Sequence, residues 1–282
     1  GGTPLPCHDD FASFYTAFRD RLFEQGRGYY ACGARYTLFA PHAGGIPDTA
    51  NSLLAIKQLV YDEQQLPLSE LADCLRKNWQ GQEDLRLHVL RTVPRYGNDI
   101  AEADAMTKRI FDDFLVAVEQ VRERNGVLRP AGVSTFGREI EWRGQRGATA
   151  DGHGHGDILA TNFSPSPGSD TQGPTAVIRS HCAMDLQRLP SGTALELKMA
   201  PESVKGEDGL KALMALMRSF VELGGFFMHI DVISNDVLRE AQQHPEQFAN
   251  LAVRVSGWSA RFVTLGADWQ EMIINRSQQV IC

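Results

Sequence analysis

Apolar residues recur at helical spacing along the first half of the chain. In residues 11–22 they fall at positions i, i+3, i+4, i+7 and i+11, so they share one face of a helix. Asn125-Gly126 is a typical helix end and closes the longest of the helical patterns. The same spacing predicts four further helices, at residues 49–60, 68–78, 84–90 and 100–124.

Other signals complete the picture of the first half. Asp48 or Thr49 is the expected N-cap of the helix that follows the loop at residues 41–47. Residues 29–39 predict a strand with a break at Gly33. The longest helix is expected to bury one stripe of six apolar residues, namely Ile110, Phe111, Phe114, Leu115, Val118 and Val121.

The pattern changes at residue 128. From there to residue 180 Gly, Ser, Thr and Pro dominate, which predicts loops around a few short strands, such as 175–178. Loops of this length are often functional. In the last third, strands are expected at 194–199 and 226–233, and two β-prone runs, 251–256 and 258–265, flank Gly257. Helices are predicted through 210–221 and 237–243 and from Trp269, and Met199, Met214 and Met217 are expected to fill the core. Strands alternating with helices indicate the α/β class.

Composition excludes several classes of protein. With 282 residues, 43% hydrophobic and 22% charged, the chain has the composition of a folded protein that buries a large core. A net charge of -7 argues against nucleic-acid binding. The absence of a long apolar run or a signal segment predicts a cytoplasmic protein without a membrane partner. Five scattered cysteines without a C-x-x-C pair indicate reduced thiols and no structural zinc or iron–sulfur site.

Gly257 lies between the two apolar runs in the segment LAVRVSGWSARF. One interpretation is a simple turn between two strands. The segment also closely resembles the radical loop of the glycyl radical enzymes, the pyruvate formate-lyase superfamily, whose motif is R-V-x-G-[YW]. In this chain the motif is filled by Arg254, Val255, Ser256, Gly257 and Trp258, and Ser259 follows it within a radical loop at residues 251–265.

The resemblance extends over nearly the whole chain, from about residue 30 to residue 276. Four segments match family blocks in the family's order: CGARYTLFAPHAGGIPDTANSLLAIKQLV, RYGND, ATADGHGHGDILATNFSPSPGSDTQGPTAVIRS and LGGFFMHIDVISNDVLREAQQHPEQFANLAVRVSGW. NFSPSPGSD and GPTAV resemble the branch of glycerol dehydratase and choline trimethylamine-lyase rather than true pyruvate formate-lyase. Three residues depart from the family pattern: Thr37, His153 and Trp258.

The resemblance implies that Gly257 stores a backbone radical for lyase or dehydratase chemistry on a small organic substrate. Glycine suits this role because a Cβ would crowd the planar radical. The implied fold is the C-terminal part of a ten-stranded α/β barrel, with residues 1–150 in the barrel domain and 151–282 in the glycine radical region. A separate radical S-adenosylmethionine activase would generate the radical, and no metal or other cofactor is bound. The family works anaerobically and is sensitive to oxygen.

The family also needs a catalytic cysteine, and none of the five cysteines has the expected neighbours. We therefore expect the chain to be inactive alone and to require a missing N-terminal half or a partner subunit that carries the cysteine. The complete enzyme is expected to be a homodimer. The alternatives are a radical-domain accessory subunit and a member of the formate acetyltransferase (transferase) or decarboxylase type.

Several other residues have two interpretations. Asp170 and Thr175 fall in a segment that lines the family's barrel interior, but each could equally cap a loop. Tyr36 could face a substrate pocket or pack in the core. His153, His155 and Asp157 carry metal-ligand side chains, but on a glycine-rich loop we expect them to be solvated.

Overall fold

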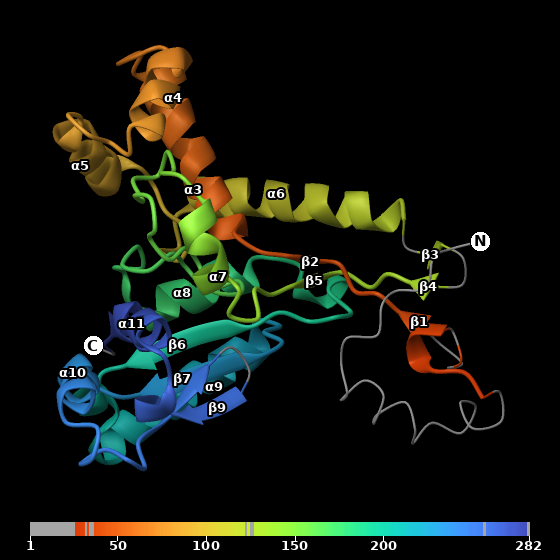
Figure 1. The fold of residues 1–282 in the computed structure, drawn as a ribbon, viewed down its shortest axis with the longest axis vertical. Helices are drawn as coiled ribbons and strands as arrows, with labels where there is room; N and C mark the ends of the chain where they lie inside the picture. Colours follow the sequence, from red (N-terminus) through yellow and green to blue (C-terminus); the bar gives the residue numbers. More distant parts are fainter. Residues whose placement is uncertain are drawn as a thin grey trace.

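The computed structural model describes residues 26–31, 33, 37–121, 123–124, 127–255 and 258–280. It is a mixed α/β structure with four small sheets in these ranges. The helices of the first half gather on one side, and a sheet with the last three helices forms the other (Figure 1). The helix predicted at 11–22, Tyr36, and Cys7, Cys32 and Cys282 lie outside the described residues. None of the helices in the described ranges is long and apolar enough to cross a membrane.

The four further helices predicted in the first half are present. They are α3 (Ile46–Ile56, continued by the π-helical turn η2, Lys57–Asp62), α4 (Leu68–Arg76), α5 (Glu83–Thr92) and α6 (Ala101–Glu119). α6 ends earlier than predicted, and Val121 is exposed, whereas Phe111, Leu115 and Val118 are buried. The predicted N-cap of α3 is wrong. Gly45, at φ 76°, precedes this helix, and Asp48 and Thr49 lie within its first turn.

The strand predicted at 29–39 is reduced to a 3-10 turn, η1 (Tyr29–Ala31), and the short β1 (Thr37–Leu38). A strand persists only where it has a partner, and β1 pairs over two residues, in parallel, with β4 (Val127–Leu128). β3 (Glu123–Arg124) is antiparallel to β4. β2 (His42–Ala43) pairs in parallel with β5 (Gly132–Val133) and carries the chain into α3.

The middle region is irregular, as expected, but its predicted strand at 175–178 is wrong. These residues belong to the helix α8 (Gly173–Cys182). Pro174 is in the first turn, where its missing N–H costs nothing, and Thr175 and Arg179 are exposed four residues apart. The other helical segments here are α7 (Glu139–Trp142) with the 3-10 turn η3 (Arg143–Gln145), and the 3-10 turn η4 (Leu186–Arg188). Residues 146–172 contain no helix or strand.

The last third is built on a parallel sheet. Its central strand β6 (Leu195–Met199) is buried throughout and lies between β7 (Met228–Val232) and β10 (Gln278–Gln279). The 3-10 turn η5 (Pro201–Val204) and α9 (Gly206–Glu222) follow β6, and α10 (Asn235–Gln243) follows β7. Ser234 caps α10 by accepting a hydrogen bond from the Val237 N–H. The chain continues through β8 (Ala252–Val255), β9 (Trp258–Arg261), the 3-10 turn η6 (Phe262–Thr264) and α11 (Ala267–Asn275).

α9 buries only part of the apolar stripe that helical spacing predicts for it, which consists of Leu210, Leu213, Met214, Met217, Phe220 and Val221. Leu216 and Phe220 pack against β6 and α8, whereas Leu210, Met217 and Val221 are exposed. Met214 is 43% exposed and Met217 49%. Of the three methionines expected to fill the core, only Met199 is buried. The helix is apolar on more than one side, and the position of the sheet decides which side is covered.

Candidate functional site

The predicted radical loop is an antiparallel hairpin of β8 and β9. Val255 pairs with Trp258 and Arg254 with Ser259. Ser256 and Gly257, the two residues between Val255 and Trp258 in the sequence, lie outside the described residues. The structure therefore brings four of the predicted loop residues together, in a register that leads directly to the glycine.

One side of this hairpin is anchored in an apolar cluster. Val253 and Val255 are 3% and 0% exposed, and they pack with Phe262 and with residues of α10 and α11. Trp258 and Ser259 are exposed, and the Trp258 ring meets Trp269 of α11 edge-on, with 6.2 Å between the ring centroids. Alternate side chains of β8 thus point into the apolar cluster and anchor that strand, whereas the side chains at the start of β9 are accessible to solvent.

Arg276, directly after α11, ties the hairpin to the parallel sheet. Its Nη1 donates a hydrogen bond of 3.1 Å to the main-chain oxygen of Arg254 in β8. The same guanidinium forms ion pairs with Glu196 of β6 (Nη2 to Oε2, 3.1 Å) and with Asp231 of β7 (Nη1 to Oδ2, 3.4 Å). Arg276 is 9% exposed and Glu196 8%, so this is a buried charge cluster. The Thr161 hydroxyl donates to Glu196, which satisfies a further carboxylate lone pair.

Lys198, two residues after Glu196 in β6, fastens the end of α11. Its Nζ donates to the main-chain oxygen of Ile274 at 2.7 Å and to Oδ1 of Asn235 at 2.8 Å. Burial, together with the nearby Arg276, lowers the pKa of Lys198 to about 8. Glu196, Lys198 and Arg276 were not among the residues predicted from the sequence. A usable signal was present, because Glu and Lys interrupt an otherwise apolar strand, and buried charges need partners.

Asp170 belongs to the same polar region. Its carboxylate accepts hydrogen bonds from the Ser277 hydroxyl, directly before β10, and from the Gln279 side-chain amide within β10. Together with Glu196 and Arg276 it lines a cavity of about 20 Å³, which is too small for a substrate. Burial raises the pKa of Asp170 to about 6, and the Ser277 hydroxyl partly offsets this rise. Thr175 does not line this cavity and is exposed on α8.

The Asp170 carboxyl should make stability depend on pH. Its pKa is about 6 in the folded chain against an ordinary value of 3.8, so the folded state holds the proton more tightly. Ionisation therefore weakens folding as pH rises from about 4 to 6, by up to about 3 kcal/mol. Asp170→Asn should remove this slope in urea unfolding followed across that range. Asp185→Asn, which changes an exposed carboxylate, is the matched control, and parallel curves for wild type and Asp170→Asn would contradict the assignment.

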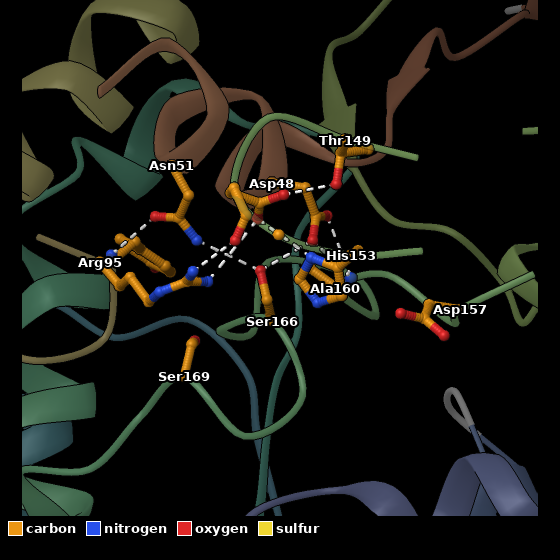
Figure 2. A network of polar contacts seen from close by, with 12 residues as sticks. Asp48, Asn51, Arg95, Thr149, His153, Asp157, Ala160, Ser166 and Ser169 are labelled. Atoms are coloured by element: carbon orange, nitrogen blue, oxygen red, sulfur yellow. Dashed lines mark hydrogen bonds and ion pairs between the residues drawn. The ribbon is translucent and has the colours of Figure 1, made fainter. Parts of the chain in front are cut away.

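A second buried polar network joins the start of α3 to the irregular segment at residues 146–172 (Figure 2). Asp48, in the first turn of α3, accepts hydrogen bonds from the Ala160 N–H and, at 2.7 Å, from the Ser166 hydroxyl. Asp151 is fully buried, and its Oδ2 lies 3.1 Å from Nδ1 of His153 and 3.8 Å from Nη1 of Arg95. These contacts hold residues 148–166 against α3 and the segment after α5.

The charges in this network compensate each other. Burial is the largest single influence on the pKa of His153 and lowers it, but the hydrogen bond to Asp151 and the charges of Asp151 and Asp48 together outweigh burial, so that pKa is raised. Burial is also the largest single influence on the pKa of Asp151 and raises it, but the hydrogen bonds from His153 and Thr149 and the nearby positive charges together outweigh burial, so that pKa is lowered. Burial raises the pKa of Asp48, and the neighbouring Asp151 charge adds to this rise. The shifts thus favour the charged forms of His153 and Asp151, and burial disfavours ionisation of the adjacent Asp48 carboxyl.

The alternative metal site at His153, His155 and Asp157 is not assembled. The His155 ring donates to the main-chain oxygen of Arg146, and Asp157 accepts from the Gly154 N–H. The expectation that His153 is solvated is also wrong, because its side chain is only 11% exposed and faces Asp151. Asp48, Asp151 and His153 bring three ligand-type atoms within 4.8 Å of one another. Their hydrogen bonds to each other and to neighbouring groups already satisfy them.

Two cysteines lie in the described residues. Cys74 is buried on α4, and Cys182 is the last residue of α8. Burial raises the pKa of the Cys182 thiol to about 11, so it is a poor source of thiolate.

The stretch of chain that contains the hairpin matches a known protein family. A family model described as "Glycine radical" matches residues 159–263, which include β8, β9 and Gly257. A second model, "Pyruvate formate lyase-like", matches residues 7–141. The chain belongs to the glycyl radical enzyme family.

Individual relatives agree with this assignment. The chain is 31% identical to a probable dehydratase, YbiW, of Escherichia coli over 97% of its own length and 35% of the relative's. It is 33% identical to the trans-4-hydroxy-L-proline dehydratase of Clostridioides difficile, over 92% and 33% of the two chains. The B12-independent glycerol dehydratase of Clostridium butyricum, solved with glycerol bound, superposes with a TM-score of 0.88 at 32% identity, over 95% and 34%. The chain spans about a third of the length of these relatives, and its fold matches the C-terminal third of glycyl radical enzyme structures.

Proposed function

We propose that this chain is the radical-bearing part of a glycyl radical dehydratase or lyase, in which Gly257 stores the backbone radical. The observation that carries the proposal is the hairpin register, in which the family's R-V-x-G-W motif places Val255 opposite Trp258 on either side of the glycine. The match of residues 159–263 to the glycine radical family supports it.

The residues around the hairpin suit this role. Glycine lacks a Cβ, so its Cα–H is open to abstraction and its backbone can flatten to delocalise the unpaired electron. Arg276 and the apolar cluster fix the backbone of β8 on the N-terminal side of the glycine. A fixed β8 backbone would present the glycine Cα–H in one reproducible position. The exposed β9 side leaves room for a partner surface.

The remaining parts of the reaction lie outside this chain in our proposal. A preceding segment or a partner subunit would supply the catalytic cysteine and complete the barrel around the hairpin. A radical S-adenosylmethionine activase would abstract the Gly257 hydrogen. The substrate would be a small organic molecule that loses water or another leaving group. Relatives that match this chain over about a third of their own length are dehydratases. The complete enzyme would act as a homodimer.

Anaerobic electron paramagnetic resonance tests the proposal. The chain is incubated with a matching activase, S-adenosylmethionine and a reductant, and we expect a doublet from the single remaining glycine α-hydrogen. Protein made with α-deuterated glycine should show the doublet collapsed. Gly266→Ala is the matched control, because an added Cβ there meets no atom within 4 Å. A signal that is unchanged by deuteration, or that survives Gly257→Ala, would contradict the proposal.

A further inference from the structure

A cavity of about 520 Å³ opens between the end of α5, the segment that leads into α6, and residues 167–172, which precede α8. Three basic side chains line it: Arg91, Arg95 and His153. None of its walls in the described part of the chain carries a carboxylate or belongs to the β8–β9 hairpin. The cavity is therefore a basic site that is separate from the radical loop.

All three basic groups have nitrogen atoms that a bound molecule can reach. Arg91, in the last turn of α5, is exposed. Arg95 donates from Nη2 to the main-chain oxygen of Asp151, but its Nε and Nη1 donate to no acceptor among the described residues and are not enclosed. The same holds for Nε2 of His153, because only Nδ1 of this ring faces Asp151. These nitrogens are therefore available as donors at the cavity wall.

Two of the three basic groups are held in position before any ligand arrives. The Asp151 carboxylate is fully buried, and its Oδ2 lies 3.1 Å from Nδ1 of His153 and 3.8 Å from Nη1 of Arg95 (Figure 2). Arg95 is itself only 8% exposed. Binding would therefore order few side chains, which lowers its entropic cost.

The charge beside the cavity matches a dianion. Burial lowers the pKa of His153, but the neighbouring Asp151 and Asp48 outweigh burial and raise it, which favours the imidazolium. Arginine is always charged, so three positive groups stand against the single negative charge of Asp151. Burial raises the pKa of Asp48, which opposes a second compensating charge. A phosphate monoester carries about −1.5 to −2 charges at pH 7, and arginine binds its oxygens in a bidentate manner.

The remaining walls suit a molecule larger than a phosphate ion. Leu90, Val93 and Ile100 supply apolar surface beside the basic groups, and Thr92 and Thr171 add exposed hydroxyl-bearing side chains. The volume of about 520 Å³ is within the range of cavities that bind small organic molecules. The cavity can thus accept a phosphoryl group together with a short carbon chain.

We propose that this cavity binds a small phosphate monoester, whose phosphoryl group is held by Arg91, Arg95 and His153. The site does not involve the radical, so it is tested on the unactivated chain and stands or falls separately from the function proposed above.

Isothermal titration calorimetry on the 282-residue chain tests the ligand class. The probe is sn-glycerol 3-phosphate. Glycerol lacks its phosphoryl group, glycerate carries a singly charged carboxylate in place of that group, and inorganic phosphate lacks the carbon chain. Because the site provides both an excess of positive charge and apolar wall, the monoester should bind at least about tenfold more tightly than each of the other three. Equal affinity for the monoester and any of these, or no binding of it by the folded chain, would overturn the proposal.

Variants locate the site. Arg91→Gln removes one exposed charge from the cavity wall and should weaken binding of sn-glycerol 3-phosphate about tenfold. Arg109→Gln, which removes an exposed charge from α6 outside the cavity, should leave the affinity unchanged. Thermal melts establish that each variant is folded.

A charge added to the cavity wall gives an independent test. Gln172, the exposed N-cap of α8, lines the cavity, and Gln172→Glu keeps its shape but places a carboxylate there. A carboxylate at a helix N-terminus favours folding, whereas it repels the phosphoryl group, so stability should hold and affinity should fall about tenfold. Gln247→Glu, at an exposed position after α10, is the matched control. Undiminished binding in folded Arg91→Gln or in folded Gln172→Glu would show that this cavity is not the site.

Discussion

Exposure of the activated protein to oxygen is expected to cut the chain at Gly257 and release residues 258–282. A carbon-centred radical captures dioxygen, and the peroxyl product at a backbone Cα breaks the chain at that residue. The cut should appear on a denaturing gel and by mass spectrometry only after activation. Gly257→Ala should remove both the radical and the cut, because alanine adds a Cβ at the abstraction site.

The control is another glycine of the same region. Gly266 precedes α11 with φ −62°, which alanine adopts without strain, and a Cβ there meets no atom within 4 Å. Gly266→Ala should therefore be cut as wild type is. Cleavage that persists in Gly257→Ala, or that maps to a different residue in wild type, would show that Gly257 does not carry the radical.

Arg276→Met is expected to destabilise the chain severely. The substitution leaves the Glu196 and Asp231 carboxylates without their shared counter-charge, in a site where Glu196 is 8% exposed. It also removes the donor to the Arg254 carbonyl. Breaking a buried ion pair from one side costs about 3–5 kcal/mol, because the remaining charge stays desolvated. The melting temperature should fall by roughly 10 °C.

An exposed ion pair of the same type is the control for Arg276. Arg143 pairs with Asp268 at 2.7 Å, but the two side chains are 34% and 54% exposed. Arg143→Met should cost less than about 1 kcal/mol, since solvent already screens that pair. A loss in Arg276→Met no larger than the loss in Arg143→Met would show that the Glu196–Arg276–Asp231 cluster does not hold the hairpin to the sheet.

Local pattern predicted the elements where one face of a segment is apolar and the opposite face is polar. α4 and α5 and the start of β6 agree with their predicted ranges to within a residue or two. The pattern failed at residues 175–178, where a short apolar run is compatible with either a strand or a helix. It also failed in part on α9, where Phe220 of the predicted stripe is buried but Leu210 and Val221 of the same stripe are exposed. Leu216, outside that stripe, is buried instead, because the position of β6 determines which side of the helix is covered.

The sequence by itself determined the family and the candidate radical residue, because a motif of adjacent residues around Gly257 and its order relative to other motifs are properties of the linear chain. Tertiary structure alone decided what surrounds the β8–β9 hairpin. Arg276, Glu196 and Asp231 are far apart in the sequence, and His153 turned out to pair with Asp151 rather than with its other neighbours on the loop. Charge pairing of this kind follows from burial, which removes water as an alternative partner and forces distant groups to satisfy one another.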